Sequence, residues 1–196
     1  MAITSANRYL TRVEMEGNAE FIWSFFKSNG WTMSAVAAML GNMETESTIN
    51  PGIYENLDAT STTNGFGLVQ WTPNTKYKEW ADEYRNATDY GDIIDQVARI
   101  RYELQNDIQW IPTNKYNMSF AEFSTSTMSP EYLAQAFLYN YERPANLQQP
   151  NRSTQARRWY TFLNGLEGGT EPDNPDRPKP KQLSKFLLYF AGSKRR

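Results

Sequence analysis

The chain has 196 residues, of which 39% are hydrophobic and 21% charged, with a formal net charge of −2. This length suits one buried core plus a tail, and no apolar run approaches the ~18 residues that a membrane-spanning helix requires. Cys and His are both absent, which excludes disulfides, thiolate nucleophiles, the common zinc sites and a Ser-His-Asp relay.

The spacing of apolar residues predicts two helices in the first quarter of the chain. The first ends at the stop signal Asn29-Gly30, and the second begins near Thr32. Residues 58–72 are rich in Thr and Gly and contain an Asn-Gly step. We expect a small β-hairpin or extended loop there.

Helices return after this segment. They are expected to run from Thr72-Pro73 towards Tyr84, along residues 93–104, from Ser129-Pro130 to Tyr141, and from about residue 153 to 163. The predicted fold class is therefore mainly α, in one domain over residues 1–166. Residues 167–182 are rich in Pro, Gly and charge and indicate a linker, and residues 183–196 form a basic amphipathic tail.

The charges and the missing residue types restrict function. Residues 1–166 carry 13 Lys and Arg against 18 Asp and Glu, whereas residues 167–196 carry 7 against 4. An acidic body argues against nucleic acid as a partner. Because neither a calcium loop nor a phosphate-binding glycine loop is present, we expect no metal and no cofactor, with a metal held by oxygen ligands alone as the open alternative. An enzyme of this composition would work with carboxylates.

Two such carboxylates stand in the stretch GNMETESTIN, residues 41–50. On a helix, Glu44 and Glu46 lie ~160° apart, on opposite flanks of the apolar stripe, so one site would not readily use both. A glutamate partly desolvated at a cleft makes a good general acid. The alternative is a solvated helix end with two surface acids, and periodicity does not choose between them.

Three motifs favour Glu46 over Glu44 as the catalytic acid. They are Glu46-Ser47-x-x-Asn50-Pro51, GLVQWTP at residues 67–73, and AFxxNYERP at residues 136–144. In this order they resemble the phage tail lysozyme family and, more distantly, goose-type lysozymes and lytic transglycosylases, over most of residues 8–165. The resemblance implies a lysozyme-like helical domain that cuts peptidoglycan glycan strands between N-acetylmuramic acid and N-acetylglucosamine. Glu46 would protonate the glycosidic oxygen, and Glu44 has no comparable role.

Five further residues are predicted to bind the glycan. Ser47 would hold the helix end, or act only as a local cap. Gly67 would let the backbone approach a sugar and Gln70 would hydrogen-bond it, with simple turn geometry as the alternative for both. Trp71 and Tyr141 offer flat faces for sugar rings, although such aromatic residues more often belong to a core.

The sequence gives weaker evidence for a second catalytic carboxylate, which would act beside Glu46. Asp58 precedes the predicted hairpin and is the candidate, with an Asx-turn as its alternative role. Related enzymes can lack an obvious nucleophile. Hydrolysis and lytic transglycosylation, in which the 6-hydroxyl of the substrate attacks, therefore both stay open.

The tail and the start of the chain bear on location. The basic tail, residues 183–196, would contact an anionic membrane or wall polymer, or phage tail proteins, unless it packs on the domain or begins another module. The first 18 residues do not resemble a secretory signal. We expect a virion enzyme at the tail tip, or an endolysin held in the host cytoplasm until a holin releases it. The alternative is a non-catalytic peptidoglycan-binding or structural tail component.

Overall fold

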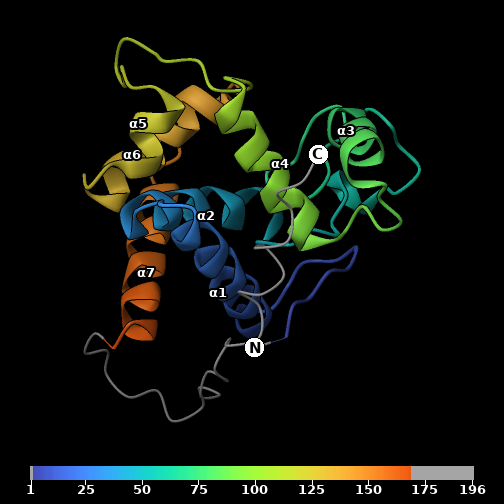
Figure 1. Cartoon of the computed structure of the whole chain (residues 1–196), viewed down its shortest axis with the longest axis horizontal. Coiled ribbons are helices and arrows are strands. Elements are labelled where there is room, and N and C mark those ends of the chain that lie inside the picture. The colour runs from blue at the N-terminus through green and yellow to red at the C-terminus, as the bar shows by residue number, and fades with distance from the viewer. Residues whose placement is uncertain (1, 169–196) are drawn as a thin grey trace, which may run out of the picture.

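The computed structural model describes residues 2–168, and the prediction of a mainly helical fold is confirmed for this part of the chain. Its elements are α1 (Arg12–Ser28), α2 (Met33–Ser47), the 3-10 turn η1 (Glu55–Leu57), α3 (Thr75–Arg85), α4 (Ile93–Gln105), α5 (Phe120–Thr125), α6 (Pro130–Phe137), the π-helical turn η2 (Leu138–Glu142) and α7 (Asn151–Leu166). Helix α2 lies at the centre, with α5, α6 and α7 to one side and α3 to the other (Figure 1).

Helix α2 is the core helix because both of its flanks are covered. Its stripe of Val36, Met39, Leu40 and Met43 is fully buried, and α2 packs against α1, α5, α6 and α7. Thr32 caps its N-terminus by accepting a hydrogen bond from the Ala35 amide. The predicted start of this helix is confirmed.

Helices α2 and α7 lie backbone to backbone at Gly41. A Cβ atom added there would lie 2.7 Å from both the Ala156 nitrogen and the Arg152 oxygen, which are backbone atoms of α7. Only glycine permits this approach. It brings the first turn of α7, and with it Arg152, to the C-terminal half of α2.

The predicted β-hairpin is not formed. The described residues contain only two isolated antiparallel bridges, and both use Phe66, with Tyr54 and Trp71 as its partners. The chain turns too tightly for a ladder, since Gly67 and Gln70 both have positive φ and the Gln70 amide donates to the Gly67 carbonyl at 3.1 Å. The segment is a loop held by side chains.

The buried side chain of Gln96 on α4 makes several of the hydrogen bonds that fix this loop. Its Oε1 accepts from the Leu68 amide at 2.8 Å, and its Nε2 donates to the carbonyls of Pro51 at 2.6 Å and Tyr90 at 2.9 Å. A Cβ atom on Gly67 would lie 2.5 Å from the Gln96 Oε1. Gly67 is thus required for packing against α4.

Three element predictions need correction. Helix α3 begins at Thr75 and not at Thr72-Pro73, a cis peptide, because Asn74 is bound into the loop through Asn64 and Ser61. Helix α5 was not expected, although Ser119 and Glu122 form a capping box at its start. The helix that opens at Ser129-Pro130 changes at Leu138 into the π-turn η2.

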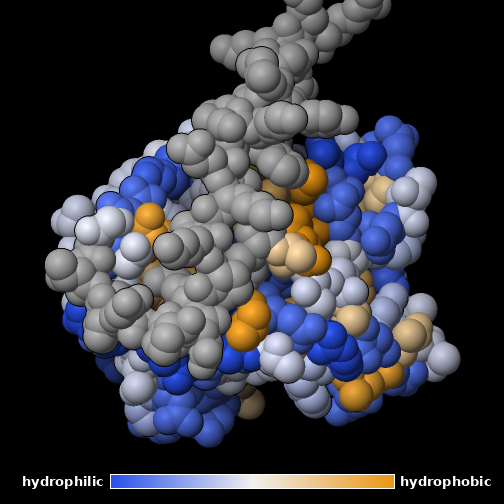
Figure 2. Space-filling view, turned by 90° about the horizontal axis from the view of Figure 1, so that it is seen from below, coloured by the Kyte–Doolittle hydropathy of each residue, from blue (hydrophilic) through white to orange (hydrophobic). Residues whose placement is uncertain are grey.

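The surface and the chain end add two observations. On the face in Figure 2 the described residues are mainly hydrophilic, with hydrophobic spots between them. No helix of the described part is long and apolar enough to cross a membrane.

Helix α7 ends at Leu166, and Glu167, the first residue of the predicted linker, pairs with Lys27 of α1. The predicted tail, residues 183–196, lies outside the described residues.

Candidate active site

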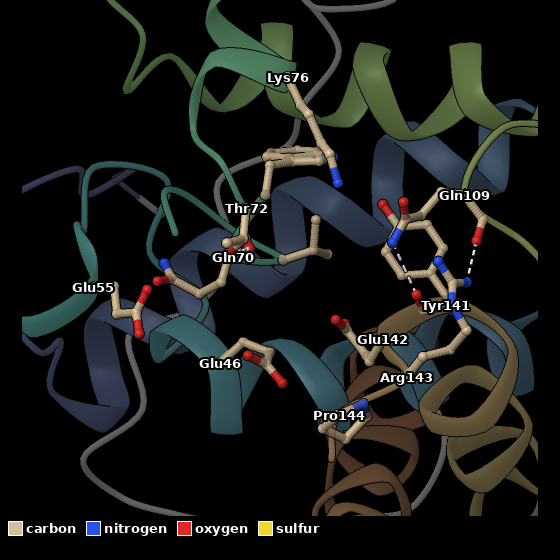
Figure 3. Close-up of a pocket in the computed structure, with 12 residues that line it drawn as sticks. Glu46, Glu55, Gln70, Thr72, Lys76, Gln109, Tyr141, Glu142, Arg143 and Pro144 are labelled. Carbon is tan, nitrogen blue, oxygen red and sulfur yellow. Dashed lines mark hydrogen bonds between the residues drawn. The ribbon is translucent and has the colours of Figure 1, made fainter. Parts of the chain in front are cut away.

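A cavity of about 430 Å³ lies between the end of α2, the loop that follows η1, and η2 (Figure 3). It brings together four of the predicted site residues, Glu46, Gln70, Trp71 and Tyr141. The full wall comprises Glu46, Glu55, Val69, Gln70, Trp71, Thr72, Lys76, Gln109, Tyr141, Glu142, Arg143 and Pro144. Elements far apart in the sequence therefore meet at one polar opening.

Glu46 occupies the last turn of α2, and its side chain is 22% exposed. The Nη2 of Arg152, a side chain only 3% exposed, donates to its Oε1. Arg152 is itself fixed by Asn42 Oδ1 at 3.0 Å and by Gln149 Oε1 at 2.7 Å. Glu46 is thus held in position from one side and open to the cavity on the other.

Glu44 lies on the other flank of α2 and is not part of the cavity wall. Its carboxylate accepts from the Trp159 indole at 2.7 Å and pairs with Arg158, both on α7. Helix geometry separated the two acids as expected. Glu44 joins two helices, whereas Glu46 faces the opening.

Ser47 and Gly67 lie outside the cavity wall, and their contacts match the structural alternatives. The Ser47 hydroxyl is buried and lies within hydrogen-bonding distance of the carbonyls of Met43 (3.0 Å) and Leu68 (2.8 Å). Ser47 therefore ties the end of α2 to the loop. Gln70 does reach the cavity, with its Nε2 donating to the Gly67 carbonyl at 3.0 Å.

Trp71 and Tyr141 line the cavity, and they are only 4% and 1% exposed. The Trp71 indole donates to Glu103 Oε1 at 2.9 Å, the Tyr141 hydroxyl donates to Glu103 Oε2, and Arg99 donates to the same carboxylate at 2.9 Å. Burial raises the pKa of Glu103, and the bond from Tyr141 is the strongest influence against that rise. The two rings serve as a fixed wall more than as free stacking faces.

This buried network predicts a stability effect. Tyr141→Phe removes the hydroxyl that Glu103 uses and leaves a buried carboxyl oxygen without that donor, so the free energy of unfolding should fall by about 1.5–3 kcal/mol. Urea denaturation measures the change. Tyr139→Phe is the matched control, because the Tyr139 hydroxyl only accepts an exposed bond from Lys115, and an equal loss in both variants would contradict the prediction.

Asp58 does not reach the cavity. It is a partly exposed loop residue whose Oδ1 accepts from the Thr60 amide at 2.9 Å and from the Thr60 hydroxyl at 2.6 Å. These bonds lower its pKa. Asp58 has the contacts of the Asx-turn alternative.

Sequence reasoning missed two carboxyls that do line the cavity, Glu55 and Glu142. Glu55 begins η1, is exposed, and accepts from the Gly65 amide at 2.8 Å. Glu142 ends η2, and its Oε1 is shielded from solvent without a hydrogen-bond partner among the described residues. Position in the NYERP motif was the available signal for Glu142, while Glu55 had none beyond its nearness to the loop.

The family model for phage tail lysozyme matches residues 17–163 of the chain. The chain belongs to the phage tail lysozyme family. Morphogenesis protein 1 of Bacillus phage B103 is 52% identical over 161 residues, which is 82% of this chain and 43% of that protein. The chain thus spans less than half the length of this relative.

Every residue of the cavity wall falls within the span matched by the phage tail lysozyme family. The span also contains Arg152 and Glu103, which position Glu46 and the aromatic wall from behind. The cavity and its supports therefore belong to the family domain as a whole.

Proposed function

We propose that this chain is a muramidase that cleaves the β-1,4 bond between N-acetylmuramic acid and N-acetylglucosamine of bacterial peptidoglycan. The observation that carries the proposal is Glu46, a largely buried carboxyl open to a polar cavity in a domain of the phage tail lysozyme family. Amide groups of the wall, such as those of Gln70 and Gln109, suit the hydroxyl and acetamido groups of a glycan.

Glu46 acts as the general acid in this proposal. Because Arg152 already donates to Oε1, the proton for the leaving glycosidic oxygen is carried on Oε2. Proton donation to the leaving oxygen by a positioned carboxyl contributes about 10²–10⁴-fold to such a cleavage. The buried Arg152, Asn42 and Gln149 cluster then serves to keep Oε2 directed at the bond.

Glu55 is the better candidate than Asp58 for a base that activates water. It lies on the cavity wall, on the loop side, and it is exposed enough to reach water (Figure 3). For inverting hydrolysis, Glu55→Gln should lower kcat by about 10–100-fold. Asp58→Asn should change kcat by less than about threefold, because Asp58 contacts only its own turn. Release of reducing sugar from purified walls measures both, and a larger loss in Asp58→Asn would reverse the assignment.

Product analysis tests the reaction itself. Mass spectrometry of defined muropeptides after digestion shows a muramic acid reducing end for hydrolysis and an anhydro-muramic end for transglycosylation. We expect the reducing end. Glycan binding without either product would instead support the alternative, a non-catalytic wall-binding or structural tail component.

We place the protein in the virion, where it would open the wall during infection. The support is its relative, which is named a morphogenesis protein of a Bacillus phage. Mass spectrometry of purified particles should detect the chain at a fixed copy number. Detection only in the lysate of infected cells would favour a free endolysin.

A further inference from the structure

Glu46 is not the only carboxyl that projects into the inner part of the cavity. Glu142 enters from η2 while Glu46 enters from α2, so that two acids from separate elements face one opening (Figure 3). Glu142 Oε1 is enclosed and has no hydrogen-bond partner among the described residues. A buried carboxyl oxygen left unbonded is costly, and such groups call for a functional explanation.

The backbone is specifically shaped to put Glu142 there. Helix α6 widens into the π-turn η2, which closes with the Arg143 amide donating to the Leu138 carbonyl at 2.8 Å. Arg143 then adopts a left-handed conformation with φ 50°. Inserted π-turns are uncommon and frequently occur at functional sites.

Arg143, next in sequence, makes no hydrogen bond to the Glu142 carboxyl that the structure records, and it lowers the pKa of Glu142 least among the charged neighbours. Arg143 Nη1 donates to the carbonyls of Asn140, at 2.6 Å, and Gln109. Arg152 on α7 lowers the pKa of Glu142 more than Arg143 does, but it is bonded to Glu46, and the carboxyl of Glu103 on α4 raises that pKa. Burial raises the pKa of Glu142 well above its ordinary value, and the adjacent Glu46 adds to the rise. The other charged residues of the wall are Glu55 and Lys76.

We propose that Glu46 and Glu142 share one proton, and that Glu142 thereby keeps an acid available in the cavity at neutral pH. Two like charges in one enclosed site disfavour double ionisation, so such a pair keeps its last proton to higher pH than a single carboxyl would. In this role Glu142 is a positioning residue that acts through Glu46. The inference rests on the proposed muramidase function.

The proton balance is closed in each turnover. A proton leaves the pair through Glu46 Oε2 for the glycosidic oxygen as the C–O bond breaks. The attacking water forms the new bond at the anomeric carbon and gives one proton to Glu55, which releases it to solvent, while the pair takes up one proton from solvent and is singly protonated again. Neither carboxyl changes its net protonation over the cycle.

Glu142→Gln tests the proposal because glutamine keeps the size and removes the second titrating group. We expect the alkaline limb of the kcat/KM profile on purified walls to move by about one pH unit or more towards acid. The loss of activity relative to wild type should be largest at neutral and alkaline pH and smallest at acid pH. Glu131→Gln is the matched control, since partly exposed Glu131 pairs with Arg157 outside the cavity, and its profile should not move.

Two results would overturn the proposal. One is an unchanged alkaline limb in Glu142→Gln, and the other is an equal loss of activity at every pH with an unchanged circular dichroism spectrum, which indicates a merely structural role. Carbon NMR titration of the glutamate carboxyls tests the shared proton without relying on muramidase activity, so a failure of the pair can be told apart from a failure of the muramidase proposal. If wild type cuts no glycan, the titration of Glu142 should still move to lower pH in Glu46→Gln, because Glu46 raises the pKa of Glu142. An unmoved titration would refute the pair by itself.

Discussion

Glu46→Gln is expected to lower the rate of wall clearing by about 100-fold or more, because glutamine cannot donate a proton to the glycosidic oxygen. The fold should persist, since the amide oxygen can still accept the bond from Arg152. The measurement is the fall in turbidity of purified walls with time, alongside a thermal melt. A variant that is folded and inactive would assign the acid to Glu46.

The sequence contains its own control two positions away. Glu44 bridges α2 to Trp159 and Arg158 and does not line the cavity. Glu44→Gln should therefore clear walls within about threefold of wild type, with a stability loss of no more than about 1 kcal/mol. Equal inactivation of the two variants would show that α2 acids matter for packing and not for chemistry.

Gly41→Ala is expected to destabilise the protein by about 2 kcal/mol. A Cβ atom there meets backbone atoms of Ala156 and Arg152 at 2.7 Å, and forcing apart two packed backbones costs about 3 kcal/mol. The better helix propensity of alanine returns about 1 kcal/mol. Urea denaturation measures the net loss. Activity should fall as well, because Arg152 would be displaced from Glu46.

Gly30→Ala separates the steric effect from the effect of losing a glycine. Gly30 has φ +84°, and nothing lies within 4 Å of its added Cβ atom. The variant should lose only about 1–2 kcal/mol from the left-handed backbone and keep its activity. If Gly41→Ala proved as stable and active as wild type, the close α2–α7 contact would not be what positions Arg152.

The helices were predictable because the sequence of each shows a helical spacing of apolar residues and capping residues at its ends. The stripe from Val36 to Met43 identified α2, and Ser129-Pro130 identified the start of α6. The hairpin was wrong because the loop is fixed by the distant side chain of Gln96. The π-turn η2 could not be seen, since the residues after Phe137 continue the same apolar period.

The site was predictable only where a motif marked it. Glu46, Gln70, Trp71 and Tyr141 come together as the three motifs implied. Arg152 was missed because its partners, Glu46 and Asn42, lie more than 100 residues away in sequence. Contacts between residues so far apart leave no pattern in the neighbouring sequence. Only burial in the structure distinguishes a residue such as Arg152 from a surface charge.

The most direct test of Glu46 as the general acid is a crystal structure of Glu46→Gln with a bound peptidoglycan glycan oligomer. The sugars are expected to cross the cavity between Glu55 and Glu142. The glycosidic oxygen between N-acetylmuramic acid and N-acetylglucosamine should lie within about 3 Å of the substituted side chain at position 46, the reach needed for proton donation. An oligomer bound elsewhere, with this cavity empty, would contradict the assignment of the cavity as the active site.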